Sequence, residues 1–365
     1  MEPDIAEIAA RFRIGGRFID AAAYGAGHIN RTYVSRAATP GGVVRYVHQR
    51  INHDVFKHPE ELMSNIERVT SHIRGKHVAA GRDPARRVLT VVPALDGRSF
   101  HRTDDGEYWR TYLFVEGAHT SDVAESPDHA YSAAKAFAEF QSMVGDLPGE
   151  RLYETIPNFG DSRRRFDSLV EAAEIDAAGR AAEVAGEIDF ALARQDVTPV
   201  LGDLLARGRV PERIIHYDTK INNVLIDDRT GEGICVIDLD TVMPGAAMYD
   251  FGDMVRLGAA TAAEDERDLS KVHLDLDMFE GLARGYLEVA GRFLTPVEID
   301  YLAFSARLIA LTTGTRFLTD HLAGDVYFRT HRPGQNLDRC RTQFAMVREM
   351  EENADRMEAI VNRYR

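Results

Sequence analysis

Short runs of β-prone hydrophobic residues, separated by polar turns, fill most of the first 115 residues. Asp-Gly pairs, which favour tight turns between strands, stand at positions 96–97 and 105–106. The runs expected to form strands are 43–52, 86–95, 98–103 and 107–115. A single helix interrupts them between Pro59 and Arg74, where four apolar residues share one helical face: Leu62, Ile66, Val69 and Ile73. The pattern predicts an N-terminal antiparallel sheet with one helix packed on it.

Beyond residue 116 the hydrophobic pattern changes to that of long helices. The clearest are residues 126–144 and 295–318, and the second begins with a capping box formed by Thr295 and Glu298. A β-hairpin interrupts this region, because two strand-like runs flank the turn 228–233. We therefore expect an α+β fold with two lobes, in which residues 1–115 form the sheet lobe and residues 116–365 form a mainly helical lobe.

The composition is that of a soluble globular protein. The chain has 365 residues, which is more than one hydrophobic core usually covers, and 44% of them are hydrophobic. No apolar run approaches the ~20 residues of a membrane helix, and the acidic start lacks the basic segment of a secretory signal. Neither cysteine, Cys235 or Cys340, has a neighbour that suggests a metal site. The net charge of −14 disfavours nucleic acid as a partner. We expect a cytoplasmic enzyme with small-molecule partners.

Residues 216–227, HYDTKINNVLID, concentrate polar side chains between apolar stretches. Phosphoryl transfer to an alcohol needs a carboxylate that accepts the hydroxyl proton, together with oxygen ligands for magnesium. Asp218 is suited to the first role, Lys220 to neutralising the transferred phosphoryl group, and Asn223 to holding the metal. Asp238, at the end of the second hairpin strand, is suited to be the second metal ligand. Alone, each of these residues has a structural alternative as a turn, cap or strand-end residue, but the ordered set favours catalysis.

This stretch resembles the catalytic loop of the protein-kinase-like superfamily, H-x-D-x-x-x-x-N, in the form used by aminoglycoside phosphotransferases and choline kinases. Further segments resemble the N-acetylhexosamine 1-kinase branch: YGAGHINRTY, QRIN, YWRTYLFVEG and RFLTDHLAGDVYF. The resemblance implies a bilobal protein-kinase-like fold, ATP as phosphoryl donor, Mg²⁺ as cofactor, and an N-acetylhexosamine as acceptor at its anomeric hydroxyl. Two alternatives stay open: a kinase of another small alcohol, such as an aminoglycoside or a choline-like amino alcohol, and a nucleotide-binding pseudokinase.

Two further aspartates lie near this site in the sequence. Asp250 begins the letters D-F-G, which mark a metal ligand in protein kinases, but it follows Asp218 by 32 positions and leads into a helix. We expect Asp250 to cap that helix or to brace the catalytic loop, and Asp238 to hold the metal. The role of Asp240 stays open between a second metal contact and a turn residue.

The nucleotide is expected to lie against the N-terminal lobe. Gly25 and Gly27 would let the backbone approach the phosphates, although Asn30 stands where a third glycine is usual. The strand lysine that normally holds the phosphates is absent, and Arg50 occupies its apparent position. Glu67 is the expected ion-pair partner of Arg50, with Glu61 as the alternative. The base would lie near the lobe connection formed by Phe114, Val115 and Glu116.

The assignment of residues that would bind the acceptor depends on the resemblance. Similarity to hexosamine kinases implies that His28, Arg316 and Tyr327 contact the sugar. Taken alone, His28 is a loop histidine, and Arg316 could instead form a surface ion pair with Asp320, four residues further along the same helical face.

Overall fold

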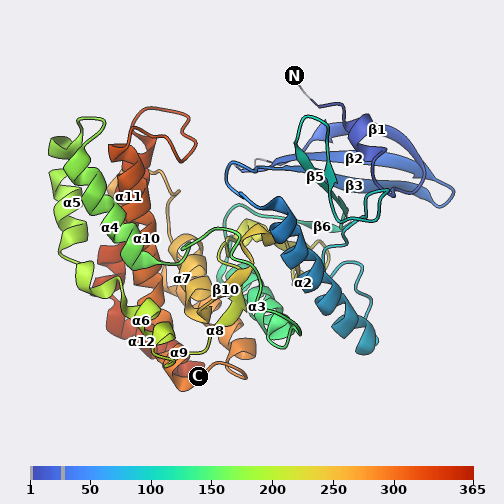
Figure 1. The fold of residues 1–365 in the computed structure, drawn as a ribbon. Coiled ribbons are helices and arrows are strands. Elements are labelled where there is room, and N and C mark those ends of the chain that lie inside the picture. The colour runs from blue at the N-terminus through green and yellow to red at the C-terminus, as the bar shows by residue number, and fades with distance from the viewer. Residues whose placement is uncertain (1–2, 26–28) are drawn as a thin grey trace.

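The structure is a computed structural model that describes residues 3–25 and 29–365 (Figure 1). The N-terminal part is an antiparallel five-stranded sheet in the order β1-β2-β3-β5-β4. Its strands are β1 (Arg17–Ala23), β2 (Arg31–Thr39), β3 (Gly42–Ile51), β4 (His101–Arg102) and β5 (Tyr108–Leu113). The short helix α1 (Ile5–Ala9) lies before the sheet in the chain, and the long helix α2 (Pro59–Ala79) follows β3. The predicted sheet with one long helix is confirmed.

The two faces of this sheet pack against different partners. Strand residues alternate between faces, so Val47 and Ile51 of β3 lie on the same side and pack in a cluster with Leu62 and Ile66 of α2. Tyr46 lies on the other side, in a second cluster with Trp109 and with Ile5 and Ile8 of α1. The helix α2 therefore covers one face of the sheet only.

One expected strand does not form. Residues 86–95 run beside β5 and make separate backbone hydrogen bonds with it, from Val92 N to Thr111 O (2.8 Å) and from Leu113 N to Thr90 O (2.9 Å). Only an isolated bridge to β5 results, because Ala94 N, the next donor on that edge, bonds to Arg98 O (2.8 Å) instead. The expected strand 98–103 shortens to the two residues of β4.

The C-terminal part contains the predicted hairpin and a set of helices. The hairpin consists of β8 (Val224–Asp227) and β9 (Gly233–Val236), and β6 (Ala118–His119) extends it to three strands. A second pair is formed by β7 (Arg213–Ile215) and β10 (Met243–Gly245). The α-helices are α3 (Pro127–Val144), α4 (Ser162–Ile175), α5 (Ala185–Leu192), α6 (Val200–Ala206), α7 (Ala247–Gly258), α8 (Leu276–Ala290), α9 (Pro296–Asp300), α10 (Leu302–Leu322), α11 (Gln335–Glu352) and α12 (Ala354–Arg363).

Helix boundaries follow capping residues. Ser126 caps α3 by accepting a hydrogen bond from His129 N, and the predicted capping box of Thr295 and Glu298 is present at α9. The long helix expected over 295–318 is divided at Tyr301 into α9 and α10. Within the C-terminal part, α3 and α8 approach closely because α8 carries Gly281 and Gly285 on the side that faces α3.

The main hydrophobic core continues through both parts of the molecule. Leu62 and Ile66 of α2 belong to the same buried cluster as Phe137 and Phe140 of α3. Figure 1 shows α2 and α3 between the sheet and the helices near the C-terminus. The sheet and the helical part are therefore joined by packed side chains on one side of the space between them.

Candidate active site

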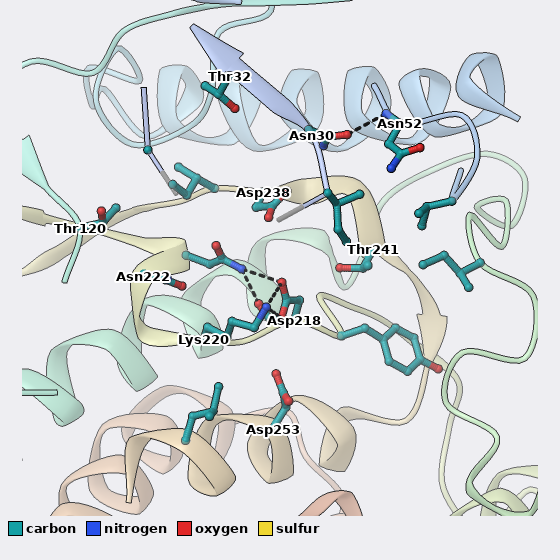
Figure 2. Close-up of a pocket in the computed structure, with 18 of the residues that line it drawn as sticks. Asn30, Thr32, Asn52, Thr120, Asp218, Lys220, Asn222, Asp238, Thr241 and Asp253 are labelled. Atoms are coloured by element: carbon teal, nitrogen blue, oxygen red, sulfur yellow. Dashed lines mark hydrogen bonds and ion pairs between the residues drawn. The ribbon is translucent and has the colours of Figure 1, made fainter. Parts of the chain in front are cut away.

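A cleft of about 1170 Å³ lies between the sheet and the helical part. Its walls include Asn30 and Thr32 from the N-terminal sheet and Asp218, Lys220 and Asp238 from the C-terminal part. Figure 2 shows Asn30 and Thr32 on one side, Asp218 and Lys220 on the other, and Asp238 between them. The hairpin β8–β9 is what places Asp218 and Asp238 together, because residue 218 precedes its first strand and residue 238 follows its second.

The Asp218 carboxylate is held by its two predicted neighbours. Lys220 Nζ lies 2.8 Å from Asp218 Oδ1, and Asn223 Nδ2 donates to Asp218 Oδ2 at 3.1 Å and to its backbone oxygen at 2.8 Å (Figure 2). Burial by itself would raise the pKa of Asp218, but the charge and hydrogen bond of Lys220 outweigh it and lower the pKa below its usual value. Asp218 is therefore a carboxylate at neutral pH, able to accept a hydrogen bond or a proton.

Asp250 fixes the loop that carries Asp218. Its carboxylate accepts hydrogen bonds from the backbone N–H groups of His216 (2.9 Å) and Tyr217 (2.7 Å), and from Gln141 Nε2 (2.6 Å). Tyr217 has a φ of 65°, a conformation that costs energy for a side chain of this size and needs such support. The geometry agrees with the predicted brace: Asp250 lies in the first turn of α7, behind the loop.

His216 connects this loop to the segment that leads to Asp238. Its Nδ1 accepts from Asp218 N at 3.3 Å, so the proton on Nε2 donates to Ile237 O at 2.9 Å. A backbone bond from Ile237 N to Asn223 O (2.9 Å) joins the same two segments. The relative positions of Asp218, Asn223 and Asp238 are thereby fixed by the backbone.

The Asp238 carboxylate is suited to a cation. It is open to the cleft, and within the described residues it accepts no hydrogen bond and has no ion-pair partner. Although its side chain is exposed to the cleft, the surrounding walls limit its solvation; this desolvation, followed by the charges of Asp240 and Asp218, raises the pKa of Asp238 to about 6. A divalent ion would offset this crowding of negative charge. In residues 3–25 and 29–365, no three acidic, histidine or cysteine side chains come together as a metal site, so the remaining ligands would be phosphate oxygens and water.

The structure places some of the predicted nucleotide residues at the cleft and others away from it. Gly25, Phe114 and Val115 line the cleft, and Gly25 has a φ of 73°. The side chain of Glu116 faces away and pairs with Arg45, and its backbone oxygen accepts from Arg86 Nε at 2.8 Å. The predicted residues Gly27 and His28 lie outside the described residues.

The prediction for Arg50 and Glu67 is wrong. Arg50 Nη1 pairs with Glu107 Oε1 at 3.2 Å, on the face of the sheet opposite to α2. Glu67 is exposed on α2, and the sheet separates it from Arg50; the alternative Glu61, also on α2, fails for the same reason. The error is one of parity, because Val47 and Gln49 of β3 line the cleft and the next residue along a strand must face away from it.

Sequence reasoning missed a buried network that joins the two parts of the molecule. Arg110 of β5 lines the cleft and forms an ion pair with Asp240, which follows β9 in the C-terminal part. Asp240 also accepts from Asn30 Nδ2 at 2.6 Å. Asp240 is thus a partner of N-terminal residues, a role outside the two alternatives considered for it. The segment YWRTYL contained an indication of this pairing. Arg110 lies between Tyr108 and Tyr112 on the same face of the strand, and a cation in such apolar surroundings needs a partner.

At the far end of the cleft, Arg316 of α10 and Tyr327 line the wall. The Arg316 guanidinium lies over the rings of Phe159 and Phe328, each 5.3 Å from the ring centroid. The alternative of an Arg316–Asp320 ion pair is wrong. Asp320 is buried and instead accepts hydrogen bonds from the backbone N–H groups of residues 326–328, which shapes the loop that carries Tyr327.

Sequence reasoning also missed Asp253 of α7, which lies beside Asp218. Asp253, labelled below Asp218 in Figure 2, accepts a hydrogen bond from Thr219 N at 2.8 Å and one from Arg256 Nε at 2.8 Å. Arg256 also pairs with Glu264 at 2.7 Å. The spacing of Asp250 and Asp253, three residues apart on one helix, could have indicated that both carboxylates face the same loop.

Comparison with known proteins agrees with this geometry. The family model described as the phosphotransferase enzyme family matches residues 20–286, which include both sides of the cleft. The chain belongs to this family and is a phosphotransferase. Among the described residues, no helix is both long and apolar enough to cross a lipid bilayer.

Solved structures share the whole architecture. A microcompartment-associated aminopropanol kinase is 18% identical with a TM-score of 0.62, and the match covers 97% of this chain and 98% of that chain. Amicoumacin kinase in complex with AMP-PNP and Ca²⁺ is 12% identical (TM-score 0.57; 96% and 92% covered). Choline kinase from Cryptosporidium parvum Iowa II is 14% identical (TM-score 0.53; 98% of both chains covered). These similarities confirm the predicted bilobal kinase-like fold.

Proposed function

We propose that the chain transfers the γ-phosphoryl group of ATP to the anomeric hydroxyl of an N-acetylhexosamine, with Mg²⁺ as cofactor. The observation that carries the choice of acceptor is the distribution of charge at the far end of the cleft. Arg316 has no carboxylate within ion-pair distance among the described residues, whereas the acidic side chains nearby are already paired with arginines. These are Asp253 and Glu264 with Arg256, and Asp325 with Arg180.

This charge distribution favours a neutral acceptor over a cationic one. The ammonium group of an amino alcohol or aminoglycoside would meet the Arg316 guanidinium without a free carboxylate beside it. Hydroxyl and acetamido oxygens are instead acceptors for guanidinium N–H groups, and the rings of Phe159, Tyr327 and Phe328 offer apolar contact for a sugar ring. The segments that resemble N-acetylhexosamine 1-kinases support the same choice.

The side chains of the cleft supply the remaining steps. A divalent ion held by Asn223 and Asp238 would neutralise charge on the phosphates of the donor. Asp218 orients the acceptor hydroxyl and takes its proton as the oxygen forms a bond to the γ-phosphorus and the bond from that phosphorus to ADP breaks. Lys220, paired with Asp218 in the free protein, is placed to meet charge on the transferred group. The products are the sugar 1-phosphate and ADP.

The proposal is tested by measuring ADP release with N-acetylglucosamine, N-acetylgalactosamine and their methyl glycosides, with phosphorus NMR of the product. A methyl glycoside keeps the ring hydroxyls and the acetamido group but has no free anomeric hydroxyl, so it should bind without being phosphorylated. Turnover of the glycosides would contradict the position of transfer.

The same assay includes aminopropanol, choline and an aminoglycoside. Because the chain carries a net charge of −14, these cations are the natural alternative. Turnover of one of these cations without turnover of either sugar would show that the acceptor is a cationic alcohol and not an N-acetylhexosamine. Nucleotide binding with no transfer to any acceptor would favour a pseudokinase.

A further inference from the structure

The N-terminal lobe has a cation at the cleft, on a strand other than β3. The register of the sheet places Gln49 of β3 directly opposite Arg110 of β5, so both side chains point to the same face. Both residues line the cleft. Among residues 3–25 and 29–115, Arg110 is the single lysine or arginine that does so.

The guanidinium of Arg110 is oriented by fixed partners. Its Nε donates to Gln49 Oε1 at 2.9 Å, and its Nη1 forms the ion pair with Asp240. Gln49 in turn donates to Thr32 Oγ1 at 3.1 Å, and Asp240 is held by Asn30. Only 1% of Arg110 and 4% of Asp240 side-chain surface is exposed, so neither can leave the network freely. These bonds use two of the five guanidinium N–H groups.

Arg110 lies close to the metal-binding side of the site. Arg110 and Asp238 line the same cleft, and Arg110 forms its ion pair with Asp240, two residues along the chain from Asp238. A phosphate chain that meets a cation at Asp238 is therefore within electrostatic reach of Arg110. A buried ion pair that faces a cleft contributes little net stability by itself, because desolvation offsets the attraction between its charges.

We propose that Arg110 binds the phosphates of the nucleotide, in the place of the missing strand lysine, and that Asp240 is the positioning residue that aims it. The inference rests on the proposed use of ATP. Arginine suits this position because its planar fork can donate to a phosphate while its other N–H groups stay bonded to Gln49 and Asp240. Lysine has no such fork. The network also ties the phosphate contact to the joint between the two lobes, since Arg110 and Asp240 belong to different lobes.

The experiment compares the affinities of ATP, ADP and adenosine by calorimetry, in EDTA and in Mg²⁺. The main variant combines Arg110→Met with Asp240→Asn, so that no buried charge is left without its partner. We expect affinity for ATP and ADP to fall roughly 10- to 100-fold, the usual effect of losing charge-assisted hydrogen bonds, with adenosine unchanged. The loss should persist in EDTA, because the contact to Arg110 does not require the metal.

Two single variants complete the design. Arg110→Lys keeps the charge and should lose part of the affinity for ATP and ADP; it also carries the test if the double variant fails to fold. Arg50→Met removes an arginine from the opposite face of the same sheet and should leave all three affinities unchanged. Thermal unfolding of each variant shows whether it is folded.

The results separate this inference from the proposed function. If the wild-type protein binds adenosine but gains no affinity from the phosphates of ADP and ATP, or binds no nucleotide, both are wrong. If the wild type prefers ATP and the folded Arg110 variants retain that preference, the inference alone is wrong and the pair with Asp240 is structural. An equal loss for adenosine and ATP would also overturn it, because Arg110 would then shape the whole cleft.

Discussion

At the scale of single residues, the cleft depends on a few carboxylates whose environments differ. The charge and hydrogen bond of Lys220 lower the pKa of Asp218, whereas desolvation and the charges of Asp240 and Asp218 raise the pKa of Asp238. Asp250 is buried, and burial raises its pKa, but its oxygens are saturated by backbone N–H groups and Gln141. The three groups therefore suit a base, a metal ligand and a brace respectively.

The first prediction concerns Asp218. We expect Asp218→Asn to fold normally, to bind nucleotide, and to lose about 10²–10⁴-fold in turnover, because an amide cannot accept the hydroxyl proton. Steady-state ADP release measures the effect. Asp228→Asn, the same change on the exposed hairpin turn, is the control and should have wild-type turnover. Near-normal turnover in a folded Asp218→Asn protein would remove this residue from the catalytic role.

The second prediction separates Asp250 from Asp238. Asp250→Asn should lower the free energy of unfolding by at least about 2 kcal/mol, because the new amide cannot accept all the hydrogen bonds that hold the loop. Asp238→Asn should leave stability unchanged or higher, since it removes a crowded charge, but should abolish magnesium-dependent activity. Urea unfolding and magnesium titration measure the two effects. The opposite result for the two variants would exchange their roles.

At the scale of elements, strand parity and helix contacts decide what each segment presents. In β3, neighbouring residues face different environments: Gln49 lines the cleft and His48 is fully buried on the other face. In α8, Gly285 lies so close to α3 that an added Cβ would be 2.2 Å from the backbone oxygen of Tyr131. A small change in side-chain size in either element should therefore lower the free energy of unfolding by a measurable amount.

The third prediction uses the contact between α3 and α8. Gly285→Ala should destabilise the protein by about 1–3 kcal/mol, because the helices must separate to admit the methyl group. Gly202→Ala, in α6, is the matched control. Nothing lies within 4 Å of a Cβ at that position, so the higher helix propensity of alanine should stabilise by up to about 1 kcal/mol. Equal effects of the two changes in thermal unfolding would contradict the close packing.

The fourth prediction concerns pH and His48 of β3. Burial lowers the pKa of His48 to about 4, and its ring nitrogens lie 2.7 Å from Ser35 Oγ and 2.9 Å from Thr111 Oγ1. The unfolded chain binds a proton at this residue near pH 6.5, before the folded chain does, so stability is lost as the pH falls from about 6.5 to about 4. At pH 5 the loss is about 2 kcal/mol.

The measurement is the free energy of unfolding at pH 7 and pH 5, compared between the wild type and His48→Gln. The variant should lose less stability over this interval, whatever its stability at pH 7. His58→Gln changes an exposed histidine before α2 and should keep the wild-type dependence. An identical pH dependence of wild type and His48→Gln would show that His48 can be protonated within the fold.

At the scale of the whole molecule, the two lobes share one hydrophobic core. The cluster that contains Leu62 and Ile66 of α2 also contains Phe137 of α3 and Phe251 of α7. The network of Asn30, Arg110 and Asp240 joins the lobes a second time, across the cleft. Separation of the lobes would expose the apolar face of α2 and break a buried ion pair.

The fifth prediction follows from this shared core. Scanning calorimetry of the full chain should show one unfolding transition, with equal calorimetric and van't Hoff enthalpies, because neither lobe can unfold and leave the other intact. Two resolved transitions would contradict it and would indicate that residues 1–115 are stable independently of the rest.

The sequence by itself determined the elements that depend on local signals and the set of residues expected to carry out phosphoryl transfer. Local signals were sufficient for α2, for the capping box of α9, and for the hairpin, because each depends on neighbouring residues. The spacing of Asp218, Asn223 and Asp238 around that hairpin was sufficient to predict that they come together. The structure places these three residues in one cleft.

The tertiary structure decided which side chains from distant segments meet. Whether Arg50 or Gln49 faces the cleft depends on a shift of one residue in β3, which an isolated segment does not reveal. The pairing of Arg110 with Asp240 joins residues 130 positions apart, so no local pattern encodes it. Burial likewise turned Asp320 from a surface ion-pair candidate into the support of a loop. Long-range contacts decide these cases, because a buried charge takes whichever partner the fold brings to it.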